Sequence, residues 1–233
     1  MAKSSKKSVA TKAAPISLNG KVPLRGRNRK PVAPRSKAAP YSAIPPRRTA
    51  NASKRQREYL TPDELERVLK ASAQIGRHGH RDRTLILLAY RHGFRVSELV
   101  SLRWEQIELK TGLMHVARIK SGLDSTHPMR GPELRALREL RRQYPDGPYE
   151  FVTERGGPLT PATFRKMFAR AGERAALPFP IHPHMLRHAT GYKLANEGHD
   201  TRALQQYLGH KNIRHTVRYT ELSPERFKGF WKD

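Results

Sequence analysis

The first quarter of this chain has a composition that a globular core cannot use. Residues 1–57 hold 16 Lys/Arg, seven prolines and no Asp or Glu. Large apolar residues are few there, and neither a helical nor a strand period runs through the segment. Such a segment buries too little apolar surface to offset the conformational entropy lost on folding. The sequence therefore predicts a disordered basic arm over 1–57, followed by one folded domain over 58–233.

The charge of the chain indicates its class of partner. The net charge is +26, of which the arm contributes +16, so 26 − 16 = +10 remains for residues 58–233. A basic excess of this size indicates a polyanion, most simply a nucleic acid. The chain has no cysteine, which excludes disulfides, thiol catalysis and Cys-ligated zinc. The longest apolar run, residues 85–90, is too short to span a bilayer, so a cytoplasmic protein without membrane contact is expected.

Periodicity and capping residues predict a mostly helical domain. Order begins at YLTPDELERVL, where Thr61 can cap a helix, Pro62 suits its first turn and Glu64 completes a capping box. Alternating residues over 106–129 predict a small antiparallel sheet, and 151–159 predict a short strand and turn. The fold class is α+β, mostly helical with one small antiparallel sheet. Helical spacing predicts two further helices that begin near 96 and near 161. It also predicts helices near 80–92, 132–143, 184–197, 200–208, 212–220 and 223–231.

Two arginines stand in contexts that suit phosphate chemistry. Cutting a DNA strand requires a nucleophile, stabilisation of charge on the non-bridging oxygens and a proton for the leaving 5′ oxygen. Guanidinium stays charged and donates two parallel hydrogen bonds to phosphate, so Arg95 in GFRVSEL and Arg187 in HPHMLRH fit this requirement. The chain has 46 basic residues, and one arginine alone is more often a surface residue.

Histidines, a tyrosine and a lysine supply the remaining groups. The imidazole of His184 titrates near neutrality and suits general acid–base catalysis, and His210 follows Leu208-Gly209 at a predicted helix end or turn. Tyr219 is a phenol with an ordinary pKa of about 10, so its proton must be accepted or its anion stabilised. Lys120 lies in the predicted hairpin and could protonate the leaving oxygen. The alternative is an ordinary core or surface tyrosine and an exposed turn lysine.

Three neighbouring histidines raise the question of a metal site. His184 and His188 are spaced i, i+4, and His182 is close to both. The zinc-peptidase pattern requires Glu after the first histidine, and here that residue is Met185. Neither a metal nor a cofactor is expected.

Four motifs in fixed order carry a family resemblance. HGFRVSEL, RIKSG, HPHMLRH and LGHKNIRHTVRYT resemble the tyrosine recombinases of the phage-integrase type over roughly 58–233. The phrases THPM and IHPHMLRHATGYKLANEGHDTRALQQYLGHKNIRHTVRYT look like those of the small fimbrial phase-switch DNA invertases. Like them, this chain would consist of the catalytic domain alone, whereas its basic arm departs from their pattern.

The resemblance implies a catalytic role at each matching position. Arg95 and Arg187 would bind the phosphate. His184 would be the acid–base partner, and His210 would donate a hydrogen bond to the phosphate. Lys120 would be the general acid and Tyr219 the nucleophile, with the carboxylate of Glu98 supporting the histidine or arginine. The implied catalytic residues are Arg95, Lys120, His184, Arg187, His210 and Tyr219.

The resemblance also implies a reaction and an assembly. Family members form a 3′-phosphotyrosyl link, rejoin strands within a tetramer on paired double-stranded DNA sites and exchange C-terminal segments. Phe227, Phe230 and Trp231 would form an apolar face for that exchange, or would pack on their own domain. Accessory DNA-bending proteins and a place at the nucleoid fit the same class. Inversion and integration or excision both stay open. The alternatives are a type IB topoisomerase and a non-catalytic DNA-binding regulator on the same scaffold.

Overall fold

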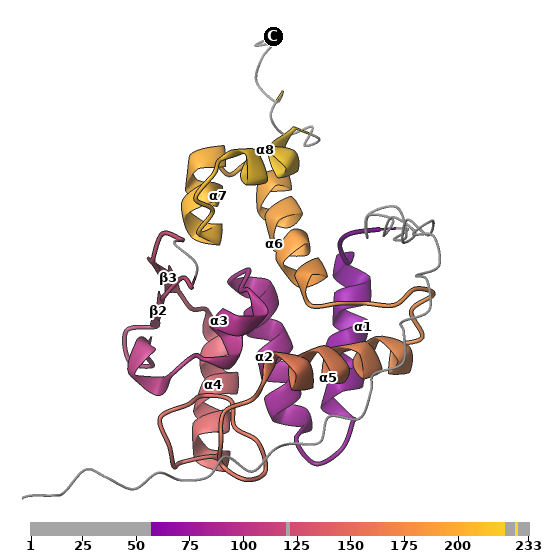
Figure 1. Cartoon of the computed structure of the whole chain (residues 1–233), viewed down its shortest axis with the longest axis vertical. Helices are drawn as coiled ribbons and strands as arrows, with labels where there is room; N and C mark the ends of the chain where they lie inside the picture. Colours follow the sequence, from indigo (N-terminus) through magenta and orange to yellow (C-terminus); the bar gives the residue numbers. More distant parts are fainter. Residues whose placement is uncertain (1–56, 120–121, 222–226, 228–233) are drawn as a thin grey trace, which may run out of the picture. The chain divides into compact units, whose positions relative to one another are not determined.

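The computed structural model describes residues 57–119, 122–221 and Phe227 (Figure 1). The predicted arm therefore lies outside the described residues, apart from Arg57. In the part that is described, no helix is long and apolar enough to cross a membrane. The elements follow in the order α1 (Pro62–Ala73), α2 (Gly79–Arg91), α3 (Val96–Val100), η2 (Trp104–Gln106), β1 (Ile107–Glu108), β2 (Leu113–Val116), β3 (Ser125–Pro128), α4 (Gly131–Gln143), α5 (Pro161–Arg174), α6 (His184–Asn196), α7 (Thr201–Leu208) and α8 (Arg214–Thr220).

Local sequence signals set where the helices begin. The predicted capping box is present at α1, where the Glu64 N–H donates to Thr61 Oγ1 at 3.4 Å and the Thr61 N–H donates to Glu64 Oε2 at 2.9 Å. At α5 the Thr163 N–H donates to Thr160 Oγ1 at 3.1 Å. These caps satisfy backbone donors that have no partner within the helix.

The predicted sheet is confirmed as a three-stranded antiparallel sheet in the order β1-β2-β3. Met114 in the middle strand pairs with Ile107 on one side and His127 on the other. The predicted strand over 151–159 is reduced to an isolated bridge between Val152 and Pro158. Proline has no N–H to extend a ladder, which explains why pairing stops there.

Two apolar clusters organise the described domain. The larger cluster contains side chains from all five helices α1 through α5 and from the first turn of α6, and Leu186 is fully buried in it. The smaller joins the far part of α6 to α7 and α8 and contains Leu204, Leu208 and Tyr219. Because α6 packs on α2, α7 and α8, it bridges both clusters (Figure 1). The α+β fold class, mostly helical with one small sheet, is confirmed.

The predicted C-terminal helix over 223–231 falls largely on residues that are not described. Phe227 is the exception, and it is exposed. Phe230 and Trp231, the other members of the predicted apolar face, lie outside the described residues.

Candidate active site

The Arg95 side chain is bonded to Glu98 and is partly exposed to solvent. It directly precedes α3, after Gly93 turns the chain with a φ of +59°. Arg95 Nη1 donates to Glu98 Oε1 at 2.8 Å, and the Arg95 backbone N–H donates to Glu98 Oε2 at 3.0 Å. The Glu98 side chain is fully buried, whereas that of Arg95 is 32% exposed. A guanidinium held in this way keeps donors for a phosphate.

A third arginine shares this carboxylate, and the sequence analysis did not single it out. Arg118 Nη1 donates to Glu98 Oε2 at 2.8 Å, and Nη2 donates to the Tyr207 carbonyl at 2.6 Å. The Arg118 backbone N–H donates to Asp124 Oδ1 at 2.7 Å across the base of the β2–β3 connection. That connection contains Lys120, which itself lies outside the described residues. The only sequence hint for Arg118 is its place two positions before Lys120.

Arg187 ties together two segments that lie far apart in the sequence. Its Nη1 donates to the Gly93 carbonyl and its Nη2 to the Leu208 carbonyl, each at 2.5 Å. These carbonyls come two residues before Arg95 and two residues before His210. Burial, with the positive charge of Arg95 nearby, lowers the pKa of Arg187 to about 9, so the group stays charged at neutral pH. The two bonds use two of five N–H donors, which leaves donors for a phosphate.

His184 begins α6 and is exposed. Its ring meets that of His188 edge-on, with the centroids 4.4 Å apart. Desolvation on its inner side and the charge of Arg187 lower the pKa of His184, so the ring is neutral at physiological pH and able to accept a proton. Arg187 lies three residues further along α6 and, unlike His184, is buried. Its carbonyl partners draw that side chain inward.

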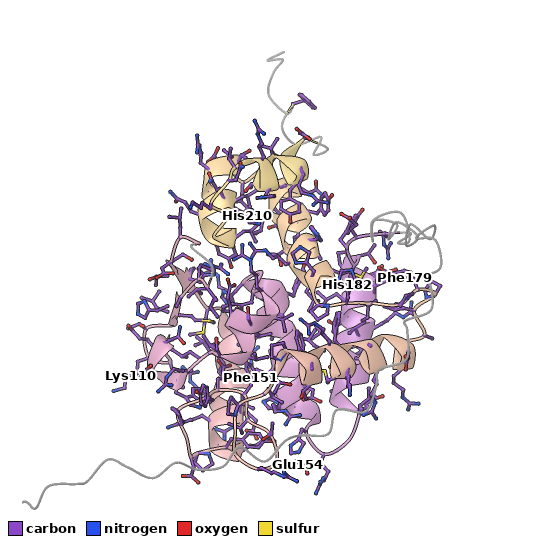
Figure 2. The ribbon with its side chains drawn as sticks, in the orientation of Figure 1. Lys110, Phe151, Glu154, Phe179, His182 and His210 are labelled. Carbon is purple, nitrogen blue, oxygen red and sulfur yellow. The ribbon has the colours of Figure 1, made fainter. Side chains whose placement is uncertain are left out.

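His210 follows the turn that the sequence predicts. Gly209 ends α7 in the left-handed conformation with a φ of +64°. His210 Nδ1 lies 2.8 Å from Thr216 Oγ1, and the imidazole stacks over the Tyr219 ring with centroids 6.3 Å apart. Burial and the charge of Arg187 lower the pKa of His210 to about 3. The neutral ring carries one N–H, which suits a hydrogen-bond donor. Figure 2 shows His210 beside α7 and His182 on the segment that leads into α6.

Tyr219 is held inside the smaller cluster. It is 2% exposed, and its hydroxyl lies 2.9 Å from His188 Nδ1. The ring lies on Gly191, where an added Cβ would come within 2.7 Å of a ring carbon. Burial raises the pKa of Tyr219 and lowers that of His188 to about 3. The pair is therefore a phenol bonded to a neutral imidazole. In the sequence, the spacing of His188 from His184 marks it only as a candidate metal ligand, and no sequence signal links it to Tyr219.

The structure gathers the predicted residues that it describes into one neighbourhood. Arg187 joins the Arg95 and His210 segments, while His188 stands between His184 and Tyr219. Among the described residues, no three His, Asp or Glu side chains are placed to hold a metal ion.

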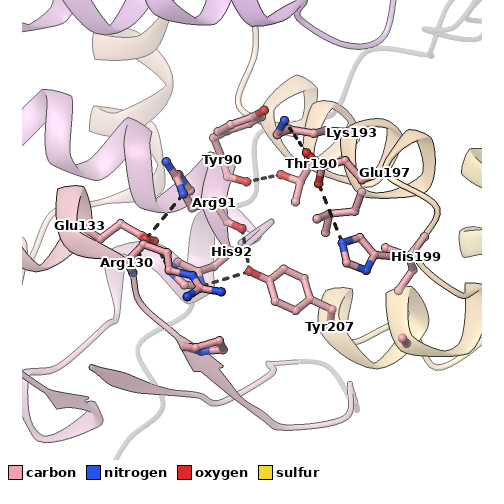
Figure 3. A pocket seen from close by; sticks show the side chains of 14 residues that line it. Tyr90, Arg91, His92, Arg130, Glu133, Thr190, Lys193, Glu197, His199 and Tyr207 are labelled. Carbon is pink, nitrogen blue, oxygen red and sulfur yellow. Dashed lines mark hydrogen bonds and ion pairs between the residues drawn. The ribbon is translucent and has the colours of Figure 1, made fainter. Parts of the chain in front are cut away.

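A cavity of about 590 Å³ opens between α2, α4, α6 and α7 (Figure 3). A chain of polar groups builds one wall, since His92 Nε2 lies 2.7 Å from Glu133 Oε1 and His92 Nδ1 lies 3.0 Å from His127 Nδ1. The Tyr207 hydroxyl donates to the Arg91 carbonyl at 2.8 Å. Burial lowers the pKa of His127 to about 3, so its ring is neutral. His92 in this wall contacts His127 on β3, the strand that follows the Lys120 connection.

Comparison with known proteins places this geometry in a family. Residues 58–226 match the Phage integrase family. Type 1 fimbriae regulatory protein FimB of Escherichia coli K12 is 44% identical over 185 residues, which cover 77% of this chain and 92% of FimB. FimE of the same strain is 41% identical over 183 residues, covering 76% of this chain and 92% of FimE. The predicted resemblance to the family and to its small fimbrial members is confirmed.

Solved recombinase structures share the fold. The crystal structure of XerA recombinase superposes with a TM-score of 0.64 at 26% identity, over 73% of this chain and 62% of XerA. XerH site-specific recombinase, bound to a palindromic difH substrate after cleavage, gives 0.62 at 26% identity over 73% of this chain and 51% of XerH. Family match, curated relatives and structural neighbours agree across the described domain. The chain belongs to the phage integrase family and is a tyrosine-type site-specific DNA recombinase.

Proposed function

We propose that Tyr219 attacks a scissile phosphate of double-stranded DNA, so that strands are cut and rejoined at defined sites. The tyrosyl oxygen bonds to phosphorus as the bond to the 5′ oxygen breaks, which leaves a 3′-phosphotyrosyl link and, after proton transfer, a free 5′-OH. The 5′-OH of a partner strand then reverses the step. The covalent link conserves the phosphodiester bond energy, so rejoining needs no further energy source.

The other residues share the charge and the protons of this step. Arg95 and Arg187 bind the non-bridging oxygens, and His210 adds a neutral donor. His184 accepts the phenol proton, and Lys120 gives a proton to the 5′ oxygen. Removing one preorganised donor typically slows such a reaction by about 10²–10³.

One observation carries the proposal. The Arg187 guanidinium donates to carbonyls that lie two residues before Arg95 and two before His210. One buried cation therefore holds the segments of the phosphate ligands at fixed positions around Tyr219. Preorganised positive charge of this kind stabilises the negative charge that develops on phosphorus oxygens.

The direction of recombination and the assembly extend the proposal. The likeness to FimB and FimE over 92% of their lengths favours inversion over integration or excision. A tetramer on paired sites would bring two duplexes together, and exposed Phe227 offers an apolar contact near the chain end. DNA-bending proteins would assist that synapsis, and a cytoplasmic, nucleoid-associated location follows from the substrate.

A non-catalytic DNA-binding regulator is the second candidate. It is favoured by the burial of Tyr219, whose hydroxyl is bonded to His188 and withheld from solvent. A regulator would use the arginines to bind phosphates and would leave the phenol as a core residue.

Covalent trapping separates the two. Cells expressing the wild-type chain or Tyr219→Phe are denatured, and protein-linked DNA is recovered and sequenced. Recombination predicts adducts at discrete repeated sites in the wild type alone. Adducts in Tyr219→Phe would show that another residue is the nucleophile. Binding at discrete sites without adducts in either protein would support the regulator.

A further inference from the structure

Arg118 is a buried cation whose partners lie on two sides. Its side chain is fully buried between Glu98 Oε2 and the Tyr207 carbonyl. The Gly209 backbone is so close that an added Cβ would lie 2.6 Å from Arg118 Nε. A buried guanidinium is costly unless its charge and donors are compensated, and Glu98 supplies that charge. Because Glu98 compensates this charge, a change at Arg118 acts first on that carboxylate.

The carboxylate that holds Arg118 also holds Arg95. Glu98 Oε1 accepts from Arg95 Nη1, whereas Glu98 Oε2 accepts from Arg118 Nη1, both at 2.8 Å. The two guanidiniums thus divide the two oxygens of one carboxylate. An arginine and a carboxylate left to themselves favour a bidentate pair with two parallel hydrogen bonds. Glu98 Oε2 also accepts from the Arg95 backbone N–H at 3.0 Å, and Arg118 adds the charged partner that keeps this oxygen from the Arg95 guanidinium.

We propose that Arg118 is a positioning residue that keeps Arg95 available to a DNA phosphate by occupying the second oxygen of Glu98. This inference rests on the proposed role of Arg95 as a phosphate ligand. Without Arg118, Glu98 turns both oxygens toward Arg95, neutralises its charge and occupies a second donor. The phosphate then loses its most exposed guanidinium, although Arg95 itself is unchanged.

The test uses the salt dependence of DNA binding in the full-length chain carrying Tyr219→Phe, which under the proposed function binds DNA without cutting it. Dissociation constants are measured over a range of salt concentrations for two duplexes of equal length. One carries a DNA site recovered by covalent trapping, and the other has a random sequence. Each phosphate contact contributes about 0.9 to the slope of log Kd against log salt. The variants are Arg95→Gln, Arg118→Met, and Arg118→Met combined with Glu98→Gln.

A matched control accounts for general loss of stability. Arg81 is also buried, and it donates to the carboxylate of Asp82 at 2.9 Å and to the Val152 carbonyl at 2.9 Å. Arg81→Met removes a comparable buried ion pair that does not involve Glu98. Thermal unfolding of each variant shows that it is folded at the assay temperature.

The expected pattern is a loss and a rescue. Arg118→Met lowers the slope by about 0.9, as Arg95→Gln does, because one phosphate contact is lost. Adding Glu98→Gln restores the slope, since the neutral amide no longer captures Arg95, whereas a merely structural role predicts no rescue. Arg81→Met keeps the wild-type slope. An unchanged slope in Arg118→Met or Arg95→Gln, or a double variant that does not recover, overturns the inference.

Arg118→Lys keeps the inference testable if the methionine variant fails to fold. The ammonium retains a positive charge beside Glu98 but lacks the planar fork that also reaches the Tyr207 carbonyl. A wild-type slope is expected, and a slope reduced to that of Arg95→Gln would contradict the inference. Adduct formation by chains with intact Tyr219 is scored separately. Its absence would refute the proposed nucleophile while the binding slopes still decide the role of Arg118.

Discussion

The hydrogen bond between Tyr219 and His188 predicts that the proposed nucleophile must leave a resting position before it reacts. The Tyr219 hydroxyl lies 2.9 Å from His188 Nδ1, and the phenol is 2% exposed. His188→Phe keeps an aromatic ring against Tyr219 but removes the hydrogen-bond partner of its hydroxyl. The buried Tyr219 hydroxyl then has no hydrogen-bond partner in the resting position. It hydrogen-bonds to water once the side chain moves to an open, solvent-exposed position.

The size of the effect follows from that loss. Leaving a buried donor unpaired costs about 1–3 kcal/mol, and about 1.4 kcal/mol corresponds to a factor of ten. The open population of Tyr219 is therefore expected to rise by about fivefold to 150-fold. If opening precedes chemistry, the initial rate of adduct formation rises by the same factor. If His188 instead takes the phenol proton during attack, the rate falls, since general acid–base groups typically contribute about 10²–10⁴.

The assay is a single-turnover measurement of protein–DNA adducts on a duplex that carries a trapped site. His199→Phe is the matched control, because His199 is an exposed histidine beyond α6 whose nearest ionic partner, Glu197, is 3.9 Å away. DNA affinity is measured in parallel for each variant. A lower rate in His188→Phe with unchanged DNA affinity would refute the resting-position reasoning and assign His188 to the chemistry.

Further predictions concern stability and the arm. Burial raises the pKa of Glu150 well above 4.5, and neither carboxylate oxygen has a hydrogen-bond partner among the described residues. The native carboxyl keeps a proton that the unfolded chain releases. The free energy of unfolding therefore falls by at most about 1.4 kcal/mol per pH unit above pH 4.5. Urea unfolding of Glu150→Gln should show a smaller decrease of this free energy with pH. Gly209→Ala forces a positive φ and a 2.6 Å contact with Arg118, so it should cost about 1–3 kcal/mol, and an unchanged melting temperature would contradict this. Deleting residues 1–57 should lower DNA affinity and flatten its salt dependence, and an unchanged slope would show that the arm does not contact DNA.

The fold was predictable where local signals act alone. The capping box at Thr61 and Glu64 and the turn at Gly209 depend on neighbours within a few residues, so the sequence contains the whole interaction. Alternation also predicted the small antiparallel sheet. It failed near Val152, where Pro158 limits pairing to one bridge.

The site was predictable where a motif marks a residue and not where a contact crosses the chain. The order of motifs pointed to Arg187 and Tyr219, but nothing in it predicts that Arg187 bonds to Gly93, 94 positions earlier. Arg118 was missed for the same reason, because its carboxylate partner lies 20 positions away and basic residues are common in this chain. Long-range pairs are set by packing, which a single sequence does not reveal.

The electrostatics of the site connect its folding to its substrate. Arg95, Arg118 and Arg187 surround the single carboxylate of Glu98, and burial keeps the neighbouring histidines neutral. Burial, and next the repulsion from Arg95 and Arg118, lower the pKa of Arg187, so its positive charge is costly in the free protein. In the proposed reaction a phosphodiester brings negative charge to this point, and a ligand that binds only the folded state stabilises that state. The repulsion that weakens the free domain thus becomes part of its affinity for DNA.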